Sequence, residues 1–248
     1  MENIYLNESR LSWKTFIKYF MAVILLSVSF IFMEVLGIIQ INAEILYSTV
    51  ISGLYIFFTI QAINPKLNNC IVNEISFRSE SLEVILIPIL TAAITRIFIN
   101  VLQAMPILFG GDIIGIAKGQ INMSTFNPIE RIFVGTIVCP FFEEFLFRVV
   151  FFTTIAYITG YIDYKFRFKI SSKVFNIKSY FCWIIIIVGN ILFSLSHLPD
   201  VSNFHLYFIF GIVFSIIYIK YGFYASWLCH GFCNYFRFAF IFSLFGVG

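Results

Sequence analysis

The sequence predicts an all-α fold: a polytopic membrane helical bundle of about seven transmembrane helices, with its site in an intramembrane cavity. The first observation behind this prediction is composition. Of the 248 residues, 60% are hydrophobic and 12% are charged, against about 45–50% and about 25% in a soluble domain. The mean hydropathy is +0.94. The second observation is that apolar runs recur along the whole chain, so we expect residues 1–248 to form a single integral membrane domain.

Most of these runs are close to the roughly 20 residues that cross the hydrocarbon core of a bilayer. The first run is too long for the apolar core of a signal peptide, and no small-residue cleavage site follows it. We therefore expect a first transmembrane helix that stays in the protein. The expected helices cover residues 16–40, 44–63, 82–108, 131–158, 179–198, 204–219 and 222–246.

Lysine and arginine are distributed unequally between the two sides of the expected bundle. If the N-terminus is cytoplasmic, only Lys118 and Arg131 face outward, which satisfies the positive-inside rule. We therefore expect a multi-pass protein of the cell membrane with a cytoplasmic N-terminus. The net charge of +3 then mostly reflects topology and gives no support for nucleic-acid binding; attraction of loop 161–178 to anionic headgroups of membrane lipids is a less favoured contribution. The basic residues on the cytoplasmic side are Arg10, Lys14, Lys18, Lys66, Arg78, Lys165, Arg167, Lys169, Lys173, Lys178 and Lys220.

Six charged residues lie well inside the expected helices, away from their ends, where an ionised side chain costs at least about 2.5–3.5 kcal/mol near the bilayer centre. Each of them therefore needs a partner, a water-filled cavity or a chemical role. They are Glu34, Arg96, Glu143, Glu144, Arg148 and Arg237. Three of the six gather in CPFFEEFLFRVVF, residues 139–151, which makes this segment the first candidate for a functional site.

Helix geometry separates the two adjacent glutamates of this segment. Glu144 and Arg148 are four residues apart, so they share a helix face and can form an ion pair. Glu143 is turned away by about 100° and can face a cavity, where a carboxylate can act as a general base. Pro140, one turn earlier, frees a backbone carbonyl and favours a kink. The alternative is a purely structural ion pair beside a protonated Glu143.

Two of the three histidines also lie in apolar helices. His197 ends the sequence FSLSH, and His230 begins HGFCN, so that Asn234 shares a helix face with His230. A lone histidine in such a helix is usually an interhelical hydrogen-bonding residue. Two of them, together with an amide and a spare carboxylate, favour an active site with a base, an imidazole and an oxyanion donor. We expect His205, which lacks such company, in a loop or at the surface.

The three motifs together resemble a known family. EEFLFR (143–148) fits the pattern EExxxR, FSLSH (193–197) fits FxxxH and HGFCN (230–234) fits HxxxN, in that order along the chain. This combination is similar to the CPBP family of intramembrane proteases. That family includes type II CAAX prenyl endopeptidases, bacteriocin-processing and bacteriocin self-immunity proteins, and abortive-infection proteins. The resemblance covers residues 80–246, as a CPBP-like protease core.

The resemblance implies an intramembrane endopeptidase and a role for each motif residue. Glu143 and His197 would activate water. His230 and Asn234 would stabilise the oxyanion of the tetrahedral intermediate. The other motif residues would support this site; they are Glu144, Arg148 and Phe193.

The same residues are compatible with a protease that uses no cofactor and with one that uses a metal ion. Glu143, His197 and His230 form a set of two histidines and one carboxylate, which can bind a divalent metal such as zinc. The helical HExxH arrangement of other intramembrane metalloproteases is absent, and Glu143 with His197 can polarise water unaided. We therefore favour a glutamate-dependent peptidase without a cofactor and keep the metal-dependent version of the same protease as an alternative.

Two structural points stay open in the sequence. His197 comes late in its expected helix, so a straight helix would place it too far from Glu143 unless the helix tilts or begins later. The other intramembrane arginines, Arg96 and Arg237, have no assigned partner. Glu34, backbone carbonyls or a cavity could accommodate them.

The expected substrate is a hydrophobic, lipidated or leader-type peptide. A prenylated C-terminus, a bacteriocin leader and a signalling propeptide all suit the motifs. The alternative from another class is a non-catalytic membrane protein, such as a bacteriocin self-immunity protein or a scaffold, in which the polar cluster only stabilises the bundle. A small transporter with Glu143 as a proton relay is less favoured, because neither half of the chain repeats the other.

Overall fold

The fold is described by a computed structural model, which covers residue 60 and residues 64–115 and 128–245. Over these residues the structure is all-helical and contains no strand, which confirms the predicted fold class. The expected helix 16–40, and all of 44–63 except residue 60, lie outside the described residues. The count of seven transmembrane helices therefore stays a prediction.

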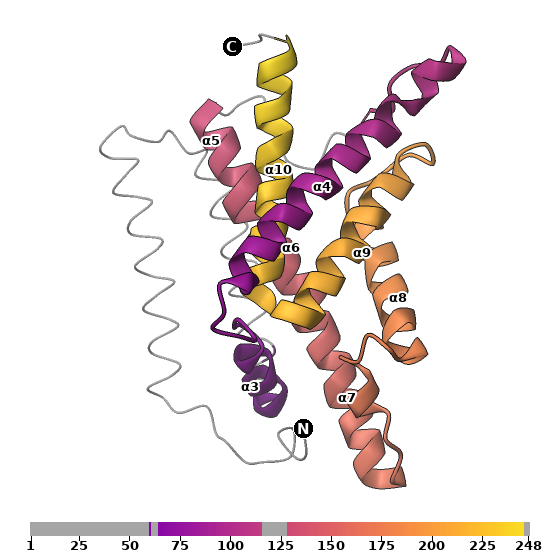
Figure 1. The fold of residues 1–248 in the computed structure, drawn as a ribbon. Helices are drawn as coiled ribbons and strands as arrows, with labels where there is room; N and C mark the ends of the chain where they lie inside the picture. The colour runs from indigo at the N-terminus through magenta and orange to yellow at the C-terminus, as the bar shows by residue number, and fades with distance from the viewer. Residues whose placement is uncertain (1–59, 61–63, 116–127, 246–248) are drawn as a thin grey trace.

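The described chain forms a bundle of helices of unequal length (Figure 1). The first, α3 (Pro65–Asn73), is not among the helices expected from the sequence; it is capped by the Asn64 side chain, which accepts from Leu67 N at 3.1 Å. The later helices agree with the expected ranges to within a few residues, apart from a longer end at residue 166. They are α4 (Glu83–Ala104, followed by the 3₁₀ turn Met105–Phe109), α5 (Pro128–Phe133), α6 (Cys139–Glu144), α7 (Phe151–Phe166), α8 (Tyr180–Ser196), α9 (Phe204–Tyr221) and α10 (Phe223–Phe245).

Three helical stretches in the described part of the chain are long and apolar enough to cross a membrane. They are Glu83–Phe109, Val134–Phe166 and Phe204–Tyr221. Helix α8 is also apolar but has only 17 residues. Helix α10 packs against α4 and α9. The chain is therefore a multi-pass membrane protein.

Residues 128–166 form one long helix that two π-helical turns divide into α5, α6 and α7. The turns are Val134–Val138 and Phe145–Val150. Pro140, the second residue of α6, has no backbone N–H, so the regular hydrogen-bond ladder cannot continue through it. Single π turns inside helices occur frequently at functional sites. Here they lie on both sides of the adjacent pair Glu143 and Glu144.

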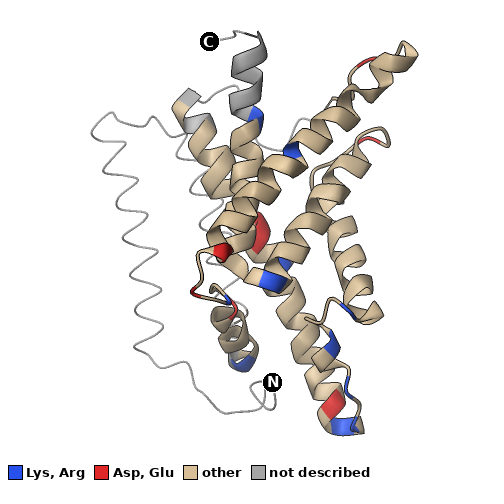
Figure 2. Ribbon diagram, in the orientation of Figure 1, with Lys and Arg blue, Asp and Glu red and all other residues tan. Residues whose placement is uncertain are grey.

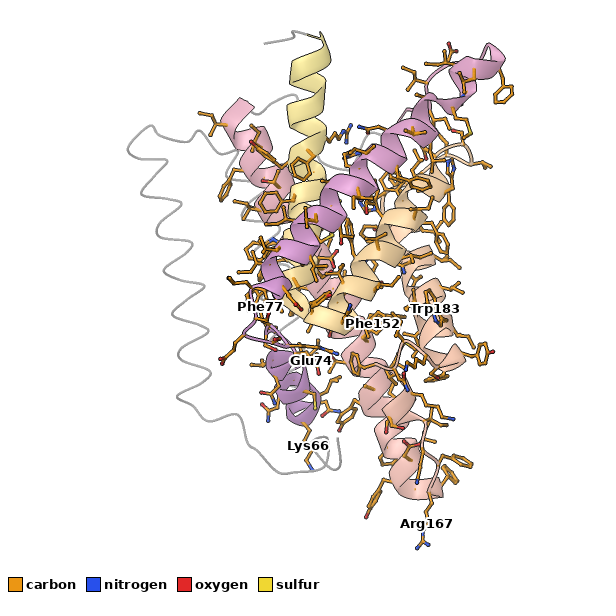
Figure 3. All side chains as sticks on the ribbon, in the orientation of Figure 1. Lys66, Glu74, Phe77, Phe152, Arg167 and Trp183 are labelled. Carbon is orange, nitrogen blue, oxygen red and sulfur yellow. The ribbon has the colours of Figure 1, made fainter. Side chains whose placement is uncertain are left out.

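The core consists of two clusters of buried side chains. One joins α7, α8 and α9 around Phe152, which is labelled in Figure 3 and whose ring lies 5.6 Å from that of Tyr218. The other joins α4, α8, α9 and α10 around Phe193 and Phe214. Apolar packing from four helices therefore surrounds the place where the polar motif residues meet.

The segment before α4 is tied to the turn between α9 and α10. Phe77, labelled in Figure 3, pairs with Gly222 in an isolated antiparallel bridge, and Arg78 N donates to Tyr221 O at 3.0 Å. Gly222 has φ +93°, and a Cβ at this position would clash with Ser76 O. Glycine is therefore required here, and it fixes the point at which α10 begins.

Lysines and arginines gather toward one end of the bundle (Figure 2). Figure 3 shows Lys66 of α3 and Arg167, which follows α7, projecting from that end. Arg78 forms an ion pair with Glu74 at 2.9 Å on the same side of the site. By the positive-inside rule this basic end would face the cytoplasm, and the orientation of the chain stays a prediction.

Candidate active site

Three side chains from three helices converge on one point. Glu143 Oε2, at the end of α6, lies 3.6 Å from His197 Nε2, which follows α8, and 3.6 Å from His230 Nε2 in α10. The Glu143 side chain is 29% exposed, whereas that of His230 is 7% exposed. Glu143 therefore remains accessible from one side while His230 closes the buried side.

In each imidazole, the acceptor that Nδ1 contacts determines which ring nitrogen carries the proton. His197 Nδ1 lies 2.9 Å from Phe193 O, and a carbonyl oxygen can only accept, so Nδ1 carries the proton. His230 Nδ1 lies 2.9 Å from Glu144 Oε1, a carboxylate acceptor, so the same holds there. In the neutral rings both Nε2 lone pairs then face Glu143 Oε2, which has no hydrogen-bond partner among the described residues. Three acceptors thus surround one point, an arrangement that suits a bound proton donor such as water.

Glu144 is fully buried and is held from three sides. Its Oε1 accepts from His230 Nδ1, and its Oε2 accepts a short hydrogen bond from Ser226 Oγ. Arg148 Nε lies 3.3 Å from the same Oε2, which confirms the ion pair predicted from the spacing of these two residues. A carboxylate in this position holds the His230 ring in one tautomer and one orientation.

Arg148 joins the motif helix to two other helices. The side chain is buried, and its Nη2 donates to Asn190 Oδ1 in α8 at 3.2 Å and to Gly211 O in α9 at 2.9 Å. Its guanidinium also lies 4.5 Å from the centre of the Phe193 ring. Planar guanidinium groups suit such combined hydrogen-bonding and stacking contacts. Arg148 and Glu144 together therefore fix α6, α8, α9 and α10 around the site.

Helix α10 supplies hydrogen bonds that the broken helix has lost. Asn234 Nδ2 donates to Gly135 O at 2.8 Å, and Trp227 Nε1 donates to Ile137 O at 2.9 Å. Both carbonyls lie in the π turn before Pro140, and Pro140 has no N–H to donate to the carbonyl five residues before it, that of Gly135. Donors from α10 therefore add to the hydrogen bonds of this interrupted part of the helix. Asn234, the predicted oxyanion donor, thus uses one amide N–H for this contact and keeps a second one.

Gly231 permits the close approach of α10 to this π turn. A Cβ at Gly231 would clash with Thr136 O, and Gly231 lies between Trp227 and Asn234 on the same face of α10. The glycine directly follows His230. The position of that histidine therefore depends on a helix contact that only glycine allows.

Aromatic rings enclose the two histidines. His197 stacks on Tyr207 of α9 with ring centres 4.6 Å apart, and His230 stacks on Phe214 at 4.3 Å. Phe193, predicted to be a supporting residue, contributes its carbonyl to His197 and places its ring 4.7 Å from the same imidazole. These rings keep water away from the faces of both imidazoles, which strengthens polar interactions at their edges.

His197 lies beside Glu143 although it comes late in its helix. Helix α8 begins at Tyr180, so a later start is not the reason. The helix ends at Ser196, and His197 Nε2 then lies 3.6 Å from Glu143 Oε2. Leu198 then takes φ +49° and turns the chain toward α9.

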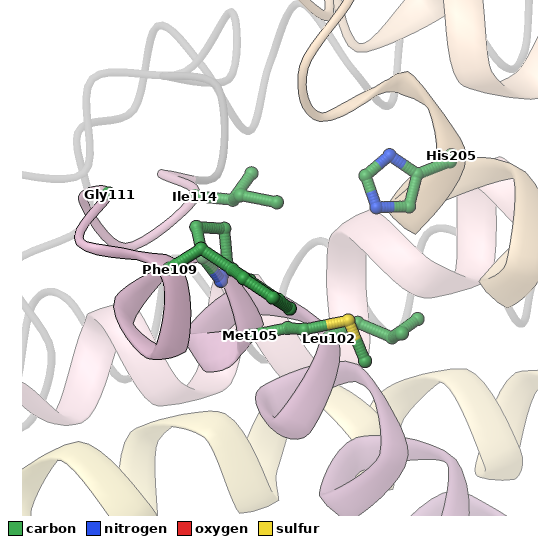
Figure 4. A pocket seen from close by; sticks show the side chains of 7 residues that line it. Leu102, Met105, Phe109, Gly111, Ile114 and His205 are labelled. Carbon is green, nitrogen blue, oxygen red and sulfur yellow. The ribbon is translucent and has the colours of Figure 1, made fainter.

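A pocket of about 420 Å³ lies elsewhere, between the end of α4 and the start of α9 (Figure 4). None of the predicted catalytic residues lines it. His205, in the first turn of α9, contributes to its wall and is exposed, as expected for a surface histidine. The pocket is lined by Leu102, Met105, Pro106, Phe109, Gly111, Ile114 and His205. The convergence of titratable groups, and not this apolar hollow, therefore marks the candidate active site.

Among the described residues, no group of three or more histidine, cysteine, aspartate or glutamate side chains has the spacing to hold a metal ion. Glu143, His197 and His230 nevertheless direct one oxygen and two nitrogen atoms toward one another. These three residues would be the ligands if a divalent ion bound here.

Two contributors to the site lie outside the three motifs. The Ser226 hydroxyl, one turn before His230, lies within hydrogen-bond distance of a Glu144 carboxylate oxygen and 2.9 Å from Phe214 O. Asn190, which belongs to none of the motifs, holds Arg148. The available signal for Asn190 was its position as an amide side chain inside a long apolar run, where such groups usually bond another helix.

Residues 125–236, a little less than half of the chain, match the family model described as type II CAAX prenyl endopeptidase Rce1-like. This range contains all three motifs and every residue of the convergent cluster. No curated protein and no solved structure matches the chain.

Proposed function

Because the chain carries an Rce1-like type II CAAX prenyl endopeptidase domain, as its resemblance to the CPBP family predicted, we propose how its own residues hydrolyse a peptide bond. At the family level the chain is a membrane protease. The substrate is a hydrophobic or lipid-associated peptide that enters between α6, α8 and α10. The observation that carries this proposal is the position of Glu143 Oε2, 3.6 Å from each of two imidazole Nε2 atoms.

Glu143 acts as the general base in this proposal, with His197 as its partner. Water bound between Glu143 Oε2 and His197 Nε2 gives a proton to the carboxylate, and its oxygen attacks the carbonyl carbon of the scissile peptide bond. The tetrahedral intermediate collapses when the C–N bond breaks. The proton held by Glu143 passes to the leaving amine, which restores the carboxylate.

His230 and Asn234 stabilise the oxyanion. Glu144 balances the positive charge that His230 carries when Nε2 is protonated, so that this ring can donate toward the oxyanion. The amide N–H of Asn234 that does not bind Gly135 provides a second donor. Donors fixed in advance and shielded from water are the most effective kind for this purpose.

A panel of hydrophobic, prenylated and leader-type peptides tests the proposal. Wild type and Glu143→Gln are purified in nanodiscs, and the products are identified by mass spectrometry. We expect cleavage by wild type and none by the variant at equal folded yield. If no peptide is cleaved, and both proteins perform the cellular task equally well, a non-catalytic role such as self-immunity or scaffolding replaces the protease.

A metal-dependent version of the same protease is the second candidate. The observation that favours it is the orientation of both histidines: Phe193 O and Glu144 fix the Nδ1 protons, so both Nε2 lone pairs point inward, as in metal ligands. Treating the wild type with a chelator distinguishes the two versions. Activity that survives chelation supports the glutamate-dependent version, and activity that is lost and then restored by zinc supports the metal-dependent one.

A further inference from the structure

The end of α7 carries a sequence that the proposed active site does not use. It is YKFRFK, residues 164–169, in which aromatic and basic residues alternate strictly. All six side chains are exposed, and the exposed fractions of Phe166 and Phe168 are 57% and 56%. Exposed apolar side chains that gather in one place commonly mark a surface that contacts a partner or a membrane. We call residues 164–169 the aromatic–basic tip.

The aromatic–basic tip is an ordered turn, because the chain that follows it folds back onto α7. The Asp163 carboxylate accepts from Ile170 N and from Ser171 N, each at 2.8 Å. Arg167 takes φ +57° and ends the helix. Val174, a few residues later, is fully buried. The turn therefore holds the exposed side chains of the tip in place, in contrast to an open loop.

The tip brings aromatic rings and positive charges together. Phe166 and Phe168 stack with their ring centres 6.0 Å apart, and Lys165 Nζ lies 5.5 Å from the centre of the Phe166 ring. Figure 2 shows basic positions at this end of α7. Among the residues that the structure describes, Lys165, Arg167 and Lys169 form no ion pair with a carboxylate. Their charges are therefore available to an anion outside the chain.

The contact between α7 and α8 gives the height of the tip. A Cβ at Gly189 of α8 would lie 2.8 Å from the Phe151 ring, so these two positions lie at a similar level. From Gly189 back to Tyr180 the axis of α8 runs about 13.5 Å. From Phe151 to Phe166 the axis of α7 runs about 22.5 Å toward the same end. Helix α7 therefore ends about 9 Å beyond the start of α8, as Figure 1 shows in outline.

Tyr180 and Trp183 mark the edge of the membrane on this side. Their exposed fractions are 91% and 37%, and tyrosine and tryptophan are enriched where a helix leaves the hydrocarbon core. Figure 3 shows Trp183 set back from Arg167 of the tip. The headgroup layer adds about 5–7 Å to each side of the hydrocarbon core. A tip about 9 Å beyond Tyr180 therefore lies at the outer part of this layer, where long basic side chains reach the lipid phosphates.

We propose that the aromatic–basic tip binds anionic phospholipid headgroups of the membrane that the protein itself spans. The three cations pair with the phosphates, and the stacked phenylalanine rings insert between the headgroups and leave water. Each basic residue near an anionic surface contributes about fivefold to binding. This contact fixes the end of the long helix 128–166, which carries Glu143. It depends neither on the proposed catalytic function nor on which side of the membrane the tip faces.

Photocrosslinking in nanodiscs tests the proposal with the full chain. Phe168 is replaced by benzoylphenylalanine, and the nanodiscs contain equal amounts of phosphatidylglycerol and phosphatidylcholine. Mass spectrometry then counts the two kinds of lipid adduct. We expect adducts with the anionic lipid to exceed those with the zwitterionic lipid by about fivefold or more. The ratio should fall toward one in concentrated salt, which screens the charges.

Charge variants locate the preference in the tip. Combining Lys165→Gln, Arg167→Gln and Lys169→Gln should bring the ratio of the two adducts close to one. A matched control removes three exposed cations outside the tip and should keep the ratio of the unaltered chain; its changes are Lys66→Gln, Lys178→Gln and Lys220→Gln. A ratio that survives in the tip variant, or that falls equally in both variants, overturns the inference.

A second crosslinking position separates contact with lipid from exposure to water. Benzoylphenylalanine at Tyr180, at the exposed start of α8, should give lipid adducts in every sample. If position 180 is crosslinked to lipid and position 168 is not, the tip projects into water and the inference is wrong. Adducts at position 168 in bulk proportion would show apolar contact without recognition of headgroups, which also contradicts the proposal. Irradiation of intact cells that yields only a protein adduct at position 168 would assign the tip to a protein partner instead.

Discussion

Glu143 and Glu144 are neighbours in sequence with different surroundings, because an α-helix turns by about 100° per residue. Glu144 points into the bundle, where Arg148, Ser226 and His230 surround it. Glu143 points to the place where the two Nε2 atoms meet. One carboxylate is therefore fully occupied by structural contacts, and the other remains available for chemistry.

The variant Arg148→Met tests whether the ion pair between Arg148 and Glu144 stabilises the bundle. The variant leaves the charge of Glu144 buried without its cation, and such a loss typically costs about 3–5 kcal/mol. We expect a clear fall in the thermal unfolding temperature in detergent and little folded protein. Lys165→Met, which removes an exposed charge, serves as the control and should unfold like the wild type. Equal stability of the two variants would show that the buried ion pair does not hold the bundle.

Asn234→Ala tests the proposed role of the second amide N–H. Loss of one oxyanion donor commonly lowers kcat by about 10²–10³-fold. We expect this loss together with a modest decrease in thermal stability, because the hydrogen bond to Gly135 O is lost as well. A drop in stability at unchanged kcat would restrict Asn234 to a bracing role. The same preparation measures both quantities, by peptide cleavage and thermal unfolding.

The contacts of a side chain could be predicted from the sequence only where spacing along one helix determines its partner. The i, i+4 spacing predicts the pair of Glu144 and Arg148, which the structure confirms. The partner of Ser226 could not be predicted, because its choice between His230 and Glu144 depends on how two helices rotate against each other. The contact of Arg96 with Cys233 O likewise joins residues far apart in sequence, and no local pattern encodes it.

At the scale of helices, the site depends on the interruption of one helix and the close approach of another. The π turn Val134–Val138 and Pro140 interrupt the helix, and Trp227 and Asn234 of α10 donate to carbonyls of this turn. The same contact positions His230 against Glu144. Interrupted helices inside membranes are tolerated where a neighbouring helix satisfies the freed groups in this way.

Gly231→Ala tests this helix contact. The added Cβ would meet the backbone oxygen of Thr136, which cannot rotate away, so α10 has to move outward. We expect a strong loss of peptide cleavage and a lower thermal unfolding temperature. Gly189→Ala is the matched comparison, because its Cβ would meet only the Phe151 ring, at 2.8 Å, and a ring can shift. If both variants behave alike, backbone contact at Gly231 is not what positions His230.

The first and last residues of the helices could be predicted better than their π turns or their positions relative to one another. Apolar length predicts α4, α8, α9 and α10 to within a few residues. The short helix α3 is too polar to register as a span, and the π turns depend on tertiary contacts with α10. The position of the end of α8 relative to Glu143 could not be predicted, because a sequence gives the length of a helix and not its height relative to its neighbours.

At the scale of the whole molecule, the distribution of charge predicts sidedness. Lys66 and Arg167 project from the basic end of the bundle (Figure 3). Helix α4 runs away from that end (Figure 1), and Asp112 follows the 3₁₀ turn at its far end. Cysteines introduced as Lys169→Cys and Asp112→Cys test this orientation in intact cells with a membrane-impermeant maleimide. We expect labelling at position 112 only, with position 169 labelled after lysis. The wild type, whose five cysteines are free, gives the background. The reverse pattern would invert the predicted topology.

The most direct test of the catalytic role of Glu143 is kcat/KM of Glu143→Gln on a cleaved peptide, measured beside wild type and Glu80→Gln. Glu80 is exposed and lies outside the site, so its variant controls for the loss of one carboxylate. Removal of a general base costs about 10²–10⁴-fold, and we expect such a loss in Glu143→Gln only, with unchanged thermal unfolding. Activity of Glu143→Gln within about twofold of wild type, far less than the loss of a general base causes, would contradict a Glu143-dependent protease.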